Sequence, residues 1–176
     1  RERLEALYDV TAMVAQETSL DELANAFSKS IQTIAHADAA AVRWADQSNQ
    51  RFLMLASSGL SADMVHEEQC IHLGDCYCGS AAINEGLRVI PINVVQQDEA
   101  QLSKKSLGYC AKSGFETVVN IPVRLHARIL GEVSLFFNAR VSPTDAERSL
   151  YEALASHLAT AMENLQLHAL EREAAI

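Results

Sequence analysis

The fold is decided by residues 114–138, which read GFETVVNIPVRLHARILGEVSLFFN. Apolar and β-branched residues dominate two runs, 116–125 and 129–138, a composition typical of largely buried strands. The link between them, residues 126–128, is short enough for a tight turn. The sequence therefore predicts an antiparallel hairpin, and Gly114 ends the element before it.

Patterns elsewhere predict helices and strands in mixed order. Apolar residues at helical spacing predict a first helix over residues 1–17, and Ser19 followed by Glu22 is a capping-box signature for a second helix. The other predicted elements before residue 114 are, in chain order, a hairpin over 39–46 and 51–57, a short helix near 61–68, a helix over 79–84 ended by Gly86, a strand over 87–92 and a helix from 96 to Cys110.

The C-terminal segment 142–176 predicts one long helix, with Ser142 as its N-cap and Pro143 as its first residue. A stripe with the spacing of a coiled-coil seam follows: Tyr151, Leu154, Leu158, Ala161, Leu165 and His168. We expect the first half of this helix to pack on the sheet. Beyond about Met162 the helix has no core of its own, so its leucines need a partner helix. We therefore predict a homodimer in which the first and last helices pair.

Composition favours a single compact domain over residues 1–176, because 49% of the residues are hydrophobic and 21% are charged. The formal net charge of -9 and a pI near 5.1 argue against nucleic acid as a partner. Apolar runs are shorter than the roughly eighteen residues of a membrane span, and no signal-peptide pattern is present. We expect a cytoplasmic domain without membrane contact. Because the first residue is Arg, we expect a piece of a longer parent protein, and whether that parent is membrane-anchored stays open.

Chemistry is expected first around Cys70, Cys76 and Cys78, with Cys110 further along the chain. Thiolates bind soft metals and exchange disulfides, so an iron–sulfur cluster, a zinc site, a redox sensor and a thiol catalyst are all open, beside a structural role in the core. An iron–sulfur cluster needs all four thiolates, although their spacing matches neither common ferredoxin pattern. Zinc is less favoured, even with a histidine as a further ligand, because paired C-x2-C ligands are missing.

A pocket for a small molecule or anion is another possibility. Trp44 on the first predicted hairpin strand and Met54 opposite it are candidate ligand-binding walls. An ordinary place in the core is the simpler explanation for both side chains.

Several phrases of the sequence resemble those of GAF domains, a family of small-molecule sensors. They are Leu4-Glu-Ala-Leu-Tyr-Asp-Val-Thr11, Leu73-Gly-Asp-Cys-Tyr-Cys-Gly79-Ser-Ala-Ala-Ile-Asn-Glu-Gly86, and Gly114 to Val123 with Ile129 to Leu135. In the second phrase Cys76 stands where the family usually has glycine. The resemblance implies an α+β fold, in which a central antiparallel sheet of five to six strands has helices on one side and a ligand pocket on the other. It also implies that the long N- and C-terminal helices pack together.

The flanking helices extend this resemblance to bacterial two-component sensor histidine kinases, with residues 1–18 as the entering helix and 142–176 as the exit helix. A cysteine-bearing loop at this place further resembles the nitrate/nitrite sensor kinases of the NarX type. The resemblance implies a regulatory small-molecule or redox-sensing domain that signals through a dimeric C-terminal helix to a kinase module of the parent chain. The sequence carries no kinase motif, so we expect no catalysis by this segment.

A thiol enzyme of the same fold is the competing hypothesis. Cys110 and Cys78-Gly79 resemble the nucleophilic and resolving positions of free methionine-(R)-sulfoxide reductases, whose chemistry needs two cysteines within reach of each other. That family carries paired acidic residues on its last strand, where this chain reads Val133-Ser-Leu-Phe-Phe137. Glu116 is the acidic residue nearest a matching place, so counter-charges for the substrate's ammonium group are missing from this resemblance.

Overall fold

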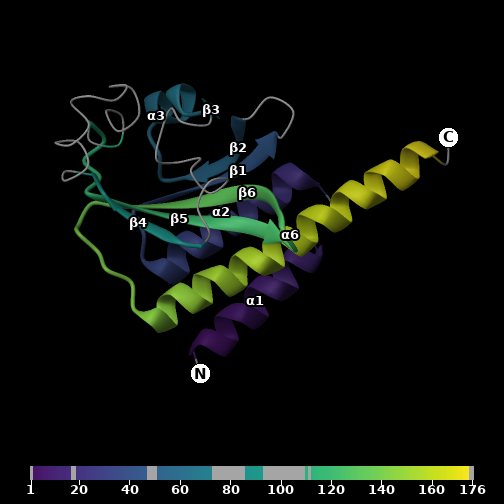
Figure 1. Ribbon diagram of the computed structural model, residues 1–176, viewed down its shortest axis with the longest axis horizontal. Coiled ribbons are helices and arrows are strands. Elements are labelled where there is room, and N and C mark those ends of the chain that lie inside the picture. The colour runs from purple at the N-terminus through teal and green to yellow at the C-terminus, as the bar shows by residue number, and fades with distance from the viewer. Residues whose placement is uncertain are drawn as a thin grey trace.

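A computed structural model describes residues 2–16, 19–46, 51–72, 86–92, 110 and 112–174. An antiparallel sheet lies at the centre, with long helices on one face and a short helix on the other (Figure 1). The strands of the described part are β1 Ala39–Asp46, β2 Arg51–Ser58, β3 Cys70–His72, β4 Arg88–Pro91, β5 Thr117–Leu125 and β6 Arg128–Phe137, in the spatial order β3-β2-β1-β6-β5-β4. The predicted α+β fold is confirmed.

The described helices are α1 Glu2–Gln16, α2 Leu20–Ala35, α3 Ala62–Glu67 and α6 Asp145–Ala174. Helices α1 and α6 pack against each other, as the resemblance implied, and the C-terminal part of α6 extends past the sheet (Figure 1). None of the helices in the described part of the chain is long and apolar enough to cross a membrane. The helices predicted over 79–84 and from 96 onward lie outside the described residues.

Both predicted hairpins are present. Leu125 faces Arg128 across the β5–β6 ladder, so His126 and Ala127 form a two-residue turn, and His126 has the positive φ of 57° that such turns require. The short strand β3 was not predicted, because three residues are too few to show an alternating pattern. It pairs with β2 and forms one edge of the sheet.

The start of α2 is as predicted. Ser19 Oγ accepts a hydrogen bond of 3.2 Å from the backbone N–H of Glu22, which satisfies a donor that the helix leaves open. Leu23, Phe27 and Ile31 then recur at helical spacing and are completely buried.

The predicted start of the last helix is wrong. Helix α6 begins at Asp145, and its cap is Thr144 rather than Ser142. Thr144 Oγ1 accepts a 3.1 Å bond from the N–H of Glu147, while Glu147 Oε1 accepts a 3.0 Å bond from the N–H of Thr144. This reciprocal capping box satisfies two donors at once, which a lone Ser142 before Pro143 cannot do.

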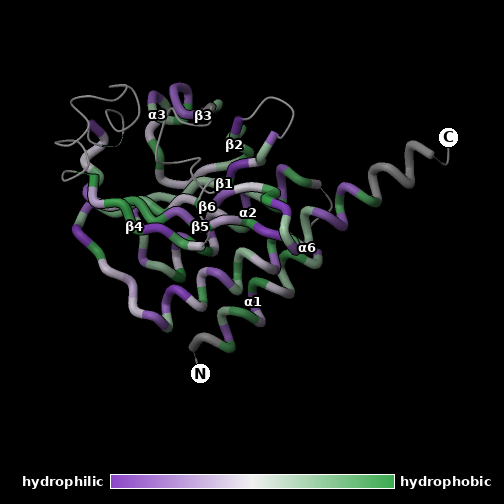
Figure 2. The backbone as a smooth tube through the Cα atoms, in the orientation of Figure 1, coloured by the Kyte–Doolittle hydropathy of each residue, from purple (hydrophilic) through white to green (hydrophobic). Residues whose placement is uncertain are grey.

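The main core lies between the sheet and the helices α1, α2 and α6. Tyr151, Leu154 and Leu158 of α6 are buried against β5 and its neighbours, so the first half of the predicted seam packs on the domain. Apolar positions recur along α1 and α6 with hydrophilic ones between them (Figure 2). Further along α6, Leu167 keeps 49% of its surface exposed.

Candidate functional site

Buried polar side chains gather on the sheet face that α1, α2 and α6 leave uncovered. Alternation along each strand places Ala41 with Arg43 on β1, and Ser134 with Phe136 on β6, on this face. The set comprises Arg43, Glu68, Asn120, Glu132 and Ser134, each at most 4% exposed, and is called the polar strip below. Buried polar groups are retained only where hydrogen bonds compensate their lost hydration, so these five side chains need partners inside the protein.

The strands fix four members of the polar strip in register. Arg43 on β1 is the cross-strand partner of Glu132 on β6, and Ser134 on β6 is the partner of Asn120 on β5. Gly131 allows β1 and β6 to approach closely beside Arg43, because a Cβ at this position would overlap the carbonyl oxygen of Arg43. The fifth member, Glu68, follows α3 and reaches the strip from outside the sheet.

Arg43 is the centre of the hydrogen-bond network. Its Nη1 donates a 2.6 Å bond to Ser134 Oγ, and its Nη2 lies 3.5 Å from Glu68 Oε2. Ser134 Oγ in turn donates to Asn120 Oδ1 at 2.9 Å and lies 3.5 Å from Glu132 Oε1. One guanidinium therefore links residues from three strands and the end of α3.

Charge in the strip is dominated by one arginine and two glutamates. Burial raises the pKa of Glu68, because desolvation disfavours its ionised form, and the positive charge of Arg43 offsets only part of that effect. The carboxylate of Glu68 thus lies in an unfavourable environment, and among the described residues its contact with Arg43 is at the long end of the hydrogen-bond range.

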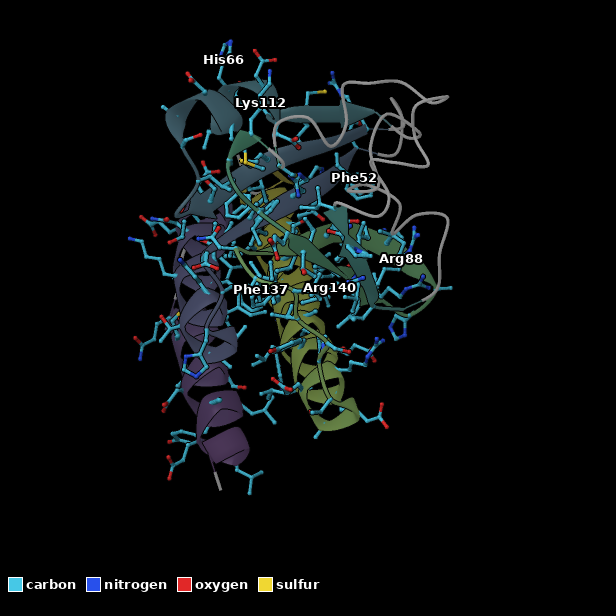
Figure 3. The ribbon with its side chains drawn as sticks, turned by 90° about the vertical axis from the view of Figure 1, so that its left-hand side faces the viewer. Phe52, His66, Arg88, Lys112, Phe137 and Arg140 are labelled. Atoms are coloured by element: carbon cyan, nitrogen blue, oxygen red, sulfur yellow. The ribbon has the colours of Figure 1, made fainter. Side chains whose placement is uncertain are left out.

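Apolar walls surround the strip on the same face. They form a second apolar cluster, separate from the main core, whose buried members are Ala39, Ala41, Met64, Ile92, Cys110, Phe115, Val118 and Phe136. Phe52 of β2, which is labelled in Figure 3, is also buried and faces Ala45 across the β1–β2 ladder. Apolar walls with a few convergent polar groups are the usual composition of a small-molecule site.

A cavity of about 610 Å³ opens beside this cluster, between α3 and residues 112–115. Met64 and Phe115 of the second apolar cluster line it, and His66 and Lys112 line it nearer the surface (Figure 3). The cavity therefore gives a route from solvent to the apolar cluster that flanks the polar strip.

The structure does not bring the two predicted ligand walls together. Trp44 packs against the helix-side core, whereas Met54 packs on the opposite face and lies across from Arg43 rather than from Trp44. The expected pairing of Met54 with Trp44 was out of register by one residue. Because side chains alternate along a strand, this shift places Met54 on the face opposite Trp44.

The four cysteines predicted as metal ligands are only partly described, since Cys76 and Cys78 lie outside the described residues. Cys110 is fully buried in the second apolar cluster. Cys70 is the cross-strand partner of Leu53 and so lies on the same sheet face as Trp44. The pKa of Arg51 is raised chiefly by the hydrogen bond that it donates to Asp46, and Cys70 contributes less. Cys70 and Cys110 therefore lie on opposite faces of the sheet, and ligation of one metal centre by all four cysteines stays a prediction. No group of three metal-ligating side chains occurs among the described residues.

Sequence reasoning missed the polar strip. Arg43 and Glu132 stand inside otherwise apolar strands, at positions that alternation turns inward, and this was the available signal. Glu132 lies one residue before the stretch 133–137, in which the resemblance to the methionine sulfoxide reductases calls for acidic residues. Of the two acidic residues Glu116, next to β5, and Glu132, on β6, Glu132 faces the site, whereas Glu116 is exposed.

The fold recurs in several solved structures of low sequence identity. The GAF domain of an Acinetobacter phosphoenolpyruvate-protein phosphotransferase aligns with a TM-score of 0.78 at 16% identity, covering 98% of this chain and 98% of that chain. Free methionine-R-sulfoxide reductase from Neisseria meningitidis, in complex with its substrate, gives 0.76 at 14% identity over 94% and 91%. A domain designated a two-component sensor histidine kinase protein from Sinorhizobium meliloti gives 0.71 at 15% identity over 89% and 99%.

Among functionally curated proteins, none matches the sequence significantly. The sequence matches the family described as GAF domain over residues 17–163, which is most of the chain. The matched range includes the whole sheet, the polar strip and the part of α6 that packs on β5. The chain belongs to the GAF domain family.

Proposed function

We propose that this GAF domain is a small-molecule sensor in a bacterial two-component histidine kinase, and that its ligand binds at the polar strip. The observation that carries the proposal is the buried network around Arg43 on the sheet face opposite α1, α2 and α6, with an apolar cluster beside it and a cavity that reaches this cluster. The likeness to the Sinorhizobium meliloti kinase domain supports the kinase context.

Strand β5 supplies a path from the polar strip to the last helix. Asn120 faces the strip, while its neighbours Val119 and Ile121 face the helix-side core that contains Leu154 and Leu158 of α6. A ligand that changes the position of Asn120 therefore changes the surface on which α6 packs. A bias of a few kcal/mol between two packings is enough to shift such an equilibrium strongly.

A second copy of the chain is the proposed partner of the terminal helices. Leu4 and Tyr8 lie one turn apart on α1 and are 73% and 75% exposed, and Leu167 on α6 is 49% exposed. Apolar side chains at helical spacing that stay exposed in one chain are buried when two such helices pair. Sedimentation of the chain should show a dimer, and replacing Leu4 and Tyr8 with Ser should weaken it. Unchanged dimerisation of that variant would show that this surface of α1 is not part of the interface.

The ligand is proposed to be a small anion or a metabolite with an anionic group, and nitrate is the candidate suggested by the likeness to nitrate/nitrite sensor kinases. The test is a thermal-shift panel of oxoanions and small carboxylic acids on the wild type and on Asn120→Ala, with Arg51→Ala as a surface control. A stabilising compound should lose its effect in Asn120→Ala and keep it in Arg51→Ala. A compound that stabilises all three equally binds elsewhere and contradicts the proposed site.

A thiol reductase is the second candidate, favoured by Glu132 on the site face and by Cys110 in the adjoining apolar cluster. In that reaction the sulfoxide oxygen leaves as water while two thiols are oxidised to a disulfide, which an added dithiol then reduces. Reduction of free methionine-(R)-sulfoxide that Cys110→Ser abolishes would put this candidate first. The sensor proposal predicts no turnover in the same assay.

A further inference from the structure

We infer that Glu68 is a built-in substitute for the ligand, and that a carboxylate group of the ligand replaces the Glu68 carboxylate on Arg43 and so releases the end of α3. This inference rests on the proposed function, since it names the ligand class and the regulation of the same site. It follows from how differently Arg43 and Glu68 are held in the fold.

Arg43 is a fixed anchor. It lies in β1 between two paired strands, it is completely buried, and its Nη1 is held by Ser134 Oγ at 2.6 Å. Its guanidinium therefore keeps one orientation, with Nη2 directed toward Glu68. A planar donor group held in this way is suited to bind a carboxylate.

Glu68 is the one member of the polar strip that the sheet does not hold. It is the C-cap residue of α3, a helix of six residues, and its side chain contacts Arg43 at 3.5 Å, compared with 2.6 Å for Ser134. Its replacement leaves the Arg43–Ser134–Asn120 part of the network intact. Among the polar contacts of Arg43 described above, the one to Glu68 is the weakest and the least anchored.

Exchange of one carboxylate for another conserves the charge of the site. Arg43 keeps one anionic partner from the ligand in place of Glu68, and Glu132 stays where the β1–β6 register holds it. The Glu68 carboxylate meanwhile regains its hydration, because Glu67 and His66 beside it are already exposed at the surface. The ligand thus gains the arginine contact, and the protein loses an unfavourable buried charge.

Release of Glu68 has a direct structural consequence. Gln69, the next residue, accepts a 2.8 Å hydrogen bond from the N–H of Met54 on β2, and Cys70 begins the edge strand β3. A movement at Glu68 therefore reaches both the wall residue Met54 and the segment that continues into the cysteine-bearing part of the chain. Occupancy at Arg43 and the position of α3 become coupled.

The test is rescue of Glu68→Ala by acetate, measured as the melting temperature of the 176-residue chain at constant ionic strength. Acetamide is the neutral probe of the same shape, and Glu67→Ala is the matched control, because it removes an exposed carboxylate from the same helix. Acetate should raise the melting temperature of Glu68→Ala with an apparent Kd about tenfold lower than for the wild type or Glu67→Ala. Acetamide should have no such effect.

Equal effects of acetate on all three proteins, or equal effects of acetate and acetamide on Glu68→Ala, would overturn the inference. If Glu68→Ala does not fold, Glu68→Gln serves instead, because the amide keeps the shape and removes the charge, and the same tenfold preference for acetate is expected. Failure of the proposed function has another signature. If the sensor function is wrong, acetate should still rescue Glu68→Ala but should leave hydrogen exchange along α6 unchanged. A compound that changes hydrogen exchange along α6 equally in the wild type and in Glu68→Ala would contradict only the inferred role of Glu68.

Discussion

At the scale of single residues, buried Arg43 is what most clearly distinguishes the polar-strip face of the sheet from the apolar helix-side face. Arginine is rarely buried completely, and here its charge is balanced by carboxylates from an adjacent strand and from the end of α3. Its long-range partners explain why the sequence did not reveal the site. Glu68 and Ser134 lie 25 and 91 residues away in the chain, so Ser134 reaches Arg43 through the strand register and Glu68 reaches it through the position of α3.

Replacing Arg43 with Met should be strongly destabilising. The change leaves Glu68 and Glu132 buried without their cation, which costs roughly 3 to 5 kcal/mol of unfolding free energy. Arg51→Ala is the control, because the Arg51–Asp46 pair is partly exposed and contributes at most about 1 kcal/mol. Urea denaturation measures both, and equal losses for the two variants would show that burial of Arg43 carries no special weight.

Glu68 predicts a specific pH dependence. Its pKa in the folded state is raised above the ordinary 4.5, so the folded chain binds this proton more readily than the unfolded chain does. The stability contributed by protonated Glu68 is complete below pH 4.5 and is lost as the pH rises through the raised pKa. Relative to Glu68→Gln, the wild type should therefore gain unfolding free energy as the pH falls toward 4.5. A difference between the two proteins that stays constant in denaturation curves over this pH range would contradict the assignment.

At the scale of elements, pattern predicted what depends on neighbouring residues. The two hairpins and the cap of α2 follow from alternation and from the Ser19–Glu22 spacing, and all are present. The start of α6 was misplaced because the pattern Ser142-Pro143 competes with Thr144 and Glu147, and only the second pair satisfies two backbone donors. Strand β3 exists through its pairing with β2 rather than through its own sequence.

The corrected cap of α6 can be tested directly. Thr144→Ala removes the acceptor for the Glu147 N–H and should lower the unfolding free energy by about 1 kcal/mol. Ser142→Ala, two residues earlier, should change it by less than about 0.5 kcal/mol, because Ser142 is exposed and does not cap the helix. Chemical denaturation that finds the larger loss in Ser142→Ala would restore the original prediction.

At the scale of the whole molecule, the sheet separates two faces that carry different kinds of side chain. One face carries α1, α2 and α6 and their apolar core, and the other carries the polar strip with α3 at its side (Figure 1). Strand β5 contributes to both, since Asn120 faces the strip and Val119 faces the α6 side. Binding at the polar strip on the second face is therefore expected to change the packing of α6 on the first.

Hydrogen exchange along α6 in Asn120→Ala, followed by mass spectrometry, tests this claim most directly. We expect faster exchange than in the wild type in the part of α6 that packs on β5, around residues 151–162. Helix α2 is the internal reference, because it packs on β1 and β2. Arg51→Ala should leave both helices unchanged. Faster exchange in β5 alone, with α6 and α2 both as in the wild type, would contradict the coupling on which the sensor function depends.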